Sequence, residues 1–83
     1  MDKLKEDLIK HFENEMDDIE AYMEMSVKAN ENGHSALGGI LHDIARDEYT
    51  HAMAIYHALG HHGEVPEKIE TMWKEIHAKY HNI

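Results

Sequence analysis

The feature that most constrains the fold is a long run, residues 2–31, that contains neither proline nor glycine. The Asn32-Gly33 pair that follows is a common way to end a helix, since both residues tolerate the left-handed backbone that closes it. Asp2 suits the N-cap position at the beginning of the run. The sequence therefore predicts one helix over residues 2–31, followed directly by a turn.

A second helix is expected over residues 35–59, with Ser35 as its N-cap and Gly60 just past its end. Gly38 and Gly39 lie in its first turns, where each costs roughly 1 kcal/mol of helix propensity relative to alanine. These two glycines either allow a neighbouring helix to approach closely or loosen the start of this helix.

Pro66 suits the first turn of a third helix, which we expect over residues 66–80. Two long helices joined by a short turn form an antiparallel hairpin, and no strand pattern or internal repeat is evident. The predicted fold is therefore all-α, with a long helical hairpin and a short third helix in a single domain that spans residues 1–83. At this length one core is marginally stable, and oligomerisation often contributes.

The composition excludes several classes of function. The chain has no cysteine, which rules out disulfides, thiolate metal sites and iron–sulfur clusters. Eight Lys and Arg against seventeen Asp and Glu give a formal net charge of -9, which argues against nucleic acid or an anionic membrane as a partner. No apolar run is long enough to span a bilayer and no signal-peptide pattern opens the chain, so we expect a cytoplasmic location.

The second helix carries a carboxylate and an imidazole inside an apolar stripe. The members of this stripe follow helical spacing and are Leu37, Leu41, Ile44, Glu48, His51, Ile55 and Leu59. Glu48 and His51 share a helix face because they are three residues apart. If the stripe is buried, these polar groups cost several kcal/mol unless something satisfies them. A metal ion would do so.

The first helix has a matching stripe with a single charged residue at its centre. Its members are Leu4, Leu8, Phe12, Glu15, Ile19, Tyr22 and Ser26. At about 1.5 Å per residue, Glu15 and Glu48 both lie roughly 23–26 Å from the turn, so an antiparallel hairpin places them at nearly the same level. Two carboxylates and one imidazole are therefore expected to meet inside the hairpin.

Three ligands are too few to complete a metal site, and two helices are too few to bury both apolar stripes. Two chains paired by a two-fold axis remedy both deficits by forming a four-helix bundle. The bundle core would hold two copies each of Glu15, Glu48 and His51, which is the ligand set of carboxylate-bridged di-iron and di-manganese bundles. This set suits two iron ions per dimer, with manganese or zinc as substitutes.

Two segments resemble the rubrerythrin-like, ferritin-like di-iron proteins. The first runs from Glu15 to Tyr22, a glutamate followed seven residues later by a tyrosine, and the second runs from Ile44 to Ala52 and contains Glu48-x-x-His51. The resemblance covers about residues 8–60 and corresponds to one half of a rubrerythrin di-iron domain. The chain lacks the second half and the cysteine-ligated rubredoxin module, and in that respect it is similar to the encapsulated ferritins.

The resemblance implies redox chemistry at a metal centre shared between subunits. The implied function is a ferroxidase that oxidises Fe(II) with dioxygen or hydrogen peroxide, with Glu15, Glu48, His51 and Tyr22 as the catalytic residues. Tyr22 would hydrogen-bond a ligand carboxylate or donate an electron; its alternative role is that of a core tyrosine. The implied partners are a second copy of the chain, or more copies, and an encapsulin shell that would enclose the protein in a nanocompartment.

Other functions remain open alternatives. The same ligands would serve a rubrerythrin-like peroxidase with an external reductant, or a non-catalytic iron or manganese buffer. A helical interaction module would use the buried polar groups only to fix the pairing of helices, although three polar groups at one level exceed what that requires.

Other polar side chains are weaker candidates for the site. Glu20 rivals Glu15 but lies off the apolar stripe. Asp18 and His11 each lie one turn from Glu15. Asp18 would supply an extra carboxylate, and His11 would contact a ligand from outside the metal group. Asp47 would orient a ligand imidazole in the same way. The paired histidines that would act as surface metal clamps are His61-His62 and His77 with His81.

Overall fold

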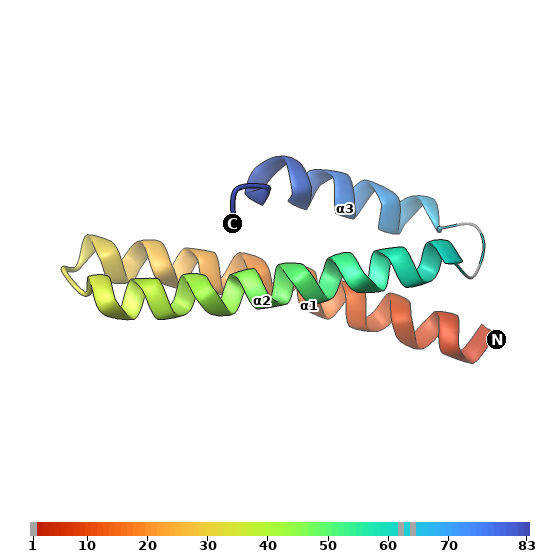
Figure 1. The fold of residues 1–83 in the computed structure, drawn as a ribbon, viewed down its shortest axis with the longest axis horizontal. Helices are drawn as coiled ribbons and strands as arrows, with labels where there is room; N and C mark the ends of the chain where they lie inside the picture. The colour runs from red at the N-terminus through yellow and green to blue at the C-terminus, as the bar shows by residue number, and fades with distance from the viewer. Residues whose placement is uncertain (1, 62, 64) are drawn as a thin grey trace.

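The computed structural model describes residues 2–61, 63 and 65–83, and over this part of the chain it is all-helical. Helices α1 (Asp2–Glu31) and α2 (Ser35–His61) run antiparallel side by side, and α3 (Glu67–Tyr80) lies along one side of the pair (Figure 1). The prediction of an all-α hairpin with a short third helix is confirmed. Within the described residues, no helix combines the length and apolar character needed to cross a membrane.

Glycines with positive φ mark the changes of chain direction. Gly33 has φ +79°, and the amide of His34 donates to the carbonyl of Ala29, which closes the C-terminal end of α1. Helix α2 continues through Gly60 to His61, two residues beyond the predicted end at Leu59, because Gly60 keeps a helical backbone. The change of direction falls instead at Gly63, with φ +127°. His62 lies outside the described residues.

Close contact between the two long helices explains one of the two adjacent glycines. A Cβ atom on Gly38 would lie 2.0 Å from the Oδ1 atom of Asn30, whereas one on Gly39 would meet no atom within 4 Å. The buried Ser26 hydroxyl donates a 2.8 Å hydrogen bond to the carbonyl of Gly38 across the same contact. Gly38 therefore serves the close approach of α1 and α2, and Gly39 does not.

Helix α3 covers one face of the hairpin and builds the core with it. The residues of this core cluster are Phe12, Met16, Ile19, Tyr49, Ala52, Leu59, Ile69 and Ile76. Ion pairs at the edge join α3 to α1: Lys68 lies 3.0 Å from Glu13, and Lys79 lies 3.1 Å from Glu20. The aromatic rings of Tyr49, Tyr56 and Trp73 pack between α2 and α3.

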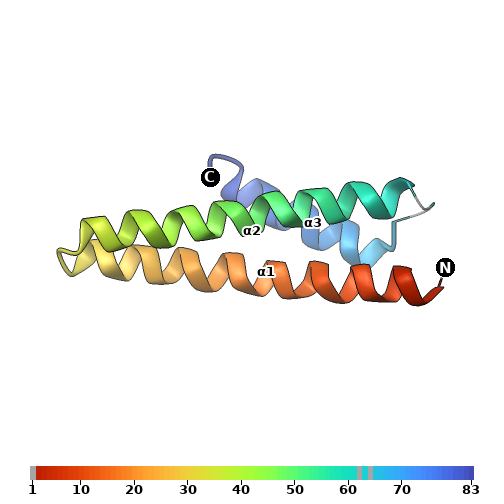
Figure 2. The same ribbon diagram turned by 60° about the horizontal axis from the view of Figure 1, so that its bottom comes forward.

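The buried face of the single chain matches the expected stripes only in part, since Phe12, Ile19 and Leu59 are buried as expected. Leu4 and Leu37 were expected to be buried, but 47% and 49% of their surfaces are exposed, whereas Met16 and Tyr49 are buried. The reason is that each long helix carries two adjacent apolar faces and α3 covers only one of them. Figure 2 shows α3 behind the hairpin, so that none of the helices in the described residues covers the near side of α1 and α2.

Candidate metal centre

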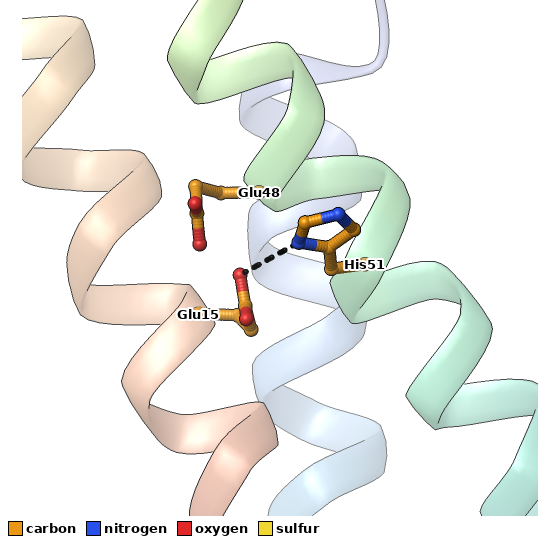
Figure 3. Close-up of side chains that lie close together, drawn as sticks. All are labelled: Glu15, Glu48 and His51. Atoms are coloured by element: carbon orange, nitrogen blue, oxygen red, sulfur yellow. Dashed lines mark ion pairs between the residues drawn. The ribbon is translucent and has the colours of Figure 1, made fainter.

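Three side chains meet at the middle of the hairpin, on the edge that faces away from α3 (Figure 3). Glu15 comes from α1, and Glu48 and His51 come from α2. One ligand atom of each lies within 4.8 Å of the others, and the Oε2 atom of Glu15 is 3.7 Å from the Nδ1 atom of His51. Two carboxylates and an imidazole therefore converge as a donor set for one or more cations.

The local structure of the two helices produces this convergence. Glu48 and His51 are one turn apart on α2, so their side chains project from the same face. Glu15 reaches them because the short turn after α1 holds the two helices antiparallel and sets the residues at one level. The level match between Glu15 and Glu48 inferred from residue counts is present in the structure.

The electrostatics of Glu15 indicate a site that lacks positive charge. Its Oε2 atom is buried and, among the described residues, has no hydrogen-bond partner. The pKa of Glu15 is raised to about 7, first by burial, then by the hydrogen bond with Glu48 and by the negative charges of Glu48 and Asp18. A bound cation would replace these unfavourable interactions with favourable ones.

The three converging side chains differ in how much of each is covered by the rest of the chain. About 19% of the Glu15 side chain is exposed, compared with 60% of the His51 side chain. The imidazole thus lies at the open side of the group, away from the core that α3 completes. The site is therefore open to further ligands on the side of His51.

Glu20, the alternative to Glu15, is engaged elsewhere. Its Oε2 atom accepts hydrogen bonds from the Nζ atom of Lys79 at 3.1 Å and from the hydroxyl of Tyr80 at 3.3 Å. Both partners belong to α3, whereas His51 belongs to α2. The position of Glu20 therefore favours a role in the docking of α3 over a role in the metal group.

The remaining candidates lie around the site or away from it. Tyr22 is half-buried on α1, and its catalytic role stays a prediction. Asp18, His11 and Asp47 are exposed, and of these only Asp18 affects the pKa of Glu15. The histidine pairs considered as surface clamps do not join the group of three ligands in the described residues.

The sequence analysis missed a polar contact between α2 and α3. The hydroxyl of Tyr49 forms a 2.5 Å hydrogen bond with the Nδ1 atom of His77, so this histidine is more than a surface residue. Burial raises the pKa of Tyr49, which favours the neutral hydroxyl. The only feature of the sequence that pointed to this contact was the position of Tyr49, which directly follows Glu48 and therefore lies on the neighbouring face of α2.

Comparison with known proteins identifies a family. The sequence profile of the rubrerythrin family matches residues 6–82, which includes all three converging side chains and α3. Neither the curated proteins nor the solved structures include a match.

Proposed function

Because the chain belongs to the rubrerythrin family, we propose that it is a non-haem di-iron protein whose metal centre is shared between two copies of the chain. The observation that carries this proposal is the convergence of Glu15, Glu48 and His51 within 4.8 Å. Each copy would contribute two carboxylates and one imidazole. Together the two copies supply the six side chains that bind a metal pair in carboxylate-bridged four-helix bundles.

The residues present fit such a metal pair. The unpartnered Oε2 atom of Glu15 supports a cation at this place, since buried carboxylate oxygens in folded proteins are normally paired. Carboxylate oxygens and an imidazole nitrogen suit iron or manganese, with zinc as a substitute. Glu15, Glu48 and His51 would hold the ions. Bound iron would supply the electrons that reduce dioxygen or hydrogen peroxide as it passes from Fe(II) to Fe(III).

The protein residues would prepare the site for this chemistry. Burial is the largest cause that raises the pKa of Glu15 to about 7 in the metal-free fold, so binding of a cation below that pH would displace a proton from this carboxyl group. Glu15 and Glu48 would then balance the charge of the metal ions. Tyr22, two turns after Glu15 on α1, would hydrogen-bond a ligand carboxylate or donate an electron.

Exposed apolar side chains support a second copy of the chain as the missing half of the site. Leu37 and Ile40, which precede the ligands on α2, are 49% and 58% exposed. Leu37, Ile44 and His51 are spaced by seven residues and share one stripe of α2. Pairing of two such faces would bury the leucines and cover the imidazole in the same step.

The proposed reaction is the oxidation of Fe(II), as substrate, by dioxygen or hydrogen peroxide. A rubrerythrin-like peroxidase is the second candidate, and the family match supports it equally. It would need an external reductant, because these 83 residues contain no cysteine to ligate an electron-transfer iron. A third candidate, a metal buffer, would use the same ligands without redox turnover.

Anaerobic titration with Fe(II), followed by addition of oxygen, tests the proposal. Binding of about two irons per dimer and a rapid rise of ferric absorbance would support the ferroxidase, whereas stoichiometric binding without accelerated oxidation would favour the buffer. Rapid oxidation by hydrogen peroxide but not by dioxygen would favour the peroxidase. Absence of stoichiometric binding would overturn the metal site itself.

A further inference from the structure

A pair of exposed histidines lies at the C-terminal end of α3, outside the group formed by Glu15, Glu48 and His51. His77 and His81 are four residues apart, and the centroids of their rings are 6.1 Å from each other. Two histidines with this spacing share one face of a helix, and such a pair is a recurrent zinc-binding arrangement. The end of α3 therefore offers two imidazoles to one ion.

The Nδ1 atom of each imidazole is already engaged. In His77 it forms a 2.5 Å hydrogen bond with the hydroxyl of Tyr49 on α2, and in His81 it lies 3.3 Å from the carbonyl of Ala78. A carbonyl can only accept, so the Nδ1 atom of His81 is the donor. A phenol hydroxyl can accept as well as donate, so His77 can adopt the same tautomer. In that tautomer both Nε2 atoms keep a free lone pair for a metal ion.

The ring of His77 is also held by aromatic packing. It stacks on Trp73, which lies one turn earlier on α3, with a centroid distance of 5.6 Å and an angle of 23° between the rings. Metal-binding histidines usually have their second ring nitrogen fixed by a hydrogen bond, which sets the tautomer and the direction of the ring. The same kind of support is present here before any ion binds.

We propose that His77 and His81 form a second metal site, which binds one Zn(II)-like divalent transition-metal ion through both Nε2 atoms. Two imidazoles without a carboxylate suit Zn(II), Cu(II) or Ni(II) better than Mg(II), Ca(II) or Mn(II). Water would occupy the remaining coordination positions. Tyr49 is a positioning residue for this site, because it holds the imidazole of His77 from α2. The site is independent of the proposed di-iron function.

Calorimetric titration with Zn(II) tests this site in the whole chain, with the other metal group disabled by Glu15→Gln and Glu48→Gln. We expect about one ion per chain and a loss of affinity of more than about tenfold on His81→Gln. His81 is exposed and its hydrogen bond stays within α3, so this substitution should leave the fold intact. An affinity that His81→Gln does not change, or an ion shared between two chains, would overturn the site.

Phenylalanine substitutions test the positioning role of Tyr49. Tyr49→Phe should weaken Zn(II) binding by about tenfold, the loss expected when a partner that orients a ligand imidazole is removed. Tyr56→Phe is the matched control, since the Tyr56 ring also packs on Trp73, at 5.3 Å, but its hydroxyl donates to Glu70 at 3.4 Å. This control should leave the affinity unchanged. Equal losses from the two variants would overturn the role of the Tyr49 hydroxyl.

Nitrogen NMR of the histidine rings gives a readout that packing alone would not change. Zn(II) should shift the Nε2 resonances of His77 and His81 and leave both Nδ1 atoms protonated. In Tyr49→Phe, His81 should keep its tautomer in the metal-free chain while His77 no longer has its Nδ1 atom fixed. A zinc shift at Nδ1 in place of Nε2 would overturn the assigned ligand atoms.

A second histidine pair with the same spacing serves as an internal control. His57 and His61 are exposed on α2, but the ring of His57 packs edge-on against Tyr56, at 5.9 Å. Their resonances should stay in place at a Zn(II) concentration that saturates the site on α3. Equal shifts at both pairs would show that exposed histidine pairs bind zinc without prior orientation, and would overturn the proposal.

Discussion

The two sides of the hairpin differ in how their polar side chains are satisfied. On the side of α3, acidic residues find partners within the chain, as Glu13 does with Lys68 and Glu20 with Lys79. On the open side, the buried Oε2 atom of Glu15 has no hydrogen-bond partner among the described residues, and large apolar side chains are exposed nearby. The polar groups on the side of α3 are thus satisfied within the chain, whereas the open side leaves a buried oxygen unpaired and apolar side chains exposed.

The largest effect should come from the core that α3 completes. Phe12 is fully buried there, so Phe12→Ala should lower the free energy of unfolding by about 3–5 kcal/mol. Leu37→Ala is the matched change on the open side and should cost under about 0.5 kcal/mol in the monomer. Urea denaturation at low protein concentration measures both. An equal loss from Leu37→Ala in the monomer would contradict the contrast between the two sides.

Removal of a ligand should weaken metal binding strongly and spare the fold. Glu48→Ala should reduce Mn(II) affinity by more than about 100-fold, beyond the loss typical for residues that only support ligands. Calorimetric titration with this redox-silent ion measures the effect without turnover. Glu20→Ala, on the side of α3, should leave the affinity within about twofold, since Glu20 is paired with Lys79. Equal losses from the two variants would contradict the assignment of Glu15 over Glu20.

The adjacent glycines of α2 offer a test of helix contact. Gly39→Ala should raise the free energy of unfolding by about 0.5–1 kcal/mol, because alanine favours the helix and no atom lies in its way. Gly38→Ala should lose that gain, since its Cβ would force the side chain of Asn30 to move. Thermal unfolding of both variants, and of Gly38→Ala with Asn30→Ala, checks this. The double variant should recover the gain; its failure to do so would place the strain elsewhere.

The last prediction concerns the pH dependence of stability, which reports on the raised pKa of Glu15. The pKa of Glu15 is about 7 in the fold, compared with 4.5 for the free group, so the folded chain holds its proton more tightly. In the metal-free chain, the contribution of the Glu15 carboxyl group to the free energy of unfolding is therefore complete below about pH 4.5. This contribution is lost as the pH rises to about 7. Urea midpoints measured between pH 5 and 7 should fall for the natural chain and fall less for Glu15→Gln. Equal pH slopes would contradict the raised pKa.

Local rules were sufficient to predict the hairpin and the level of its polar residues. The turn at Gly33 and the constant rise of a helix fix the relation between Glu15 and Glu48, whatever packs around them. The spacing of His51 from Glu48 follows from one helical turn. The convergence of these three residues was therefore predictable from residue numbers.

The face that α3 covers was not predictable in the same way. Met16 and Tyr49 lie one residue away from members of the expected stripes, and both neighbouring faces are apolar enough to be buried. The choice between them depends on long-range packing, such as that of Ile69 and Ile76 of α3 in the core with Phe12, which hydrophobic periodicity does not reveal. The Tyr49–His77 hydrogen bond was missed for the same reason.

The position of α3 also sets how many neighbours one hairpin can accept through apolar contact. A hairpin with two open apolar faces would bind a copy on each side and could stack without limit. Among the described residues, α3 covers one face of the long helices and leaves Leu37 and Ile40 exposed on another, so association through that exposed face would stop once one copy has bound. Any larger assembly would have to form through the charged exterior, where association is weaker and sensitive to salt.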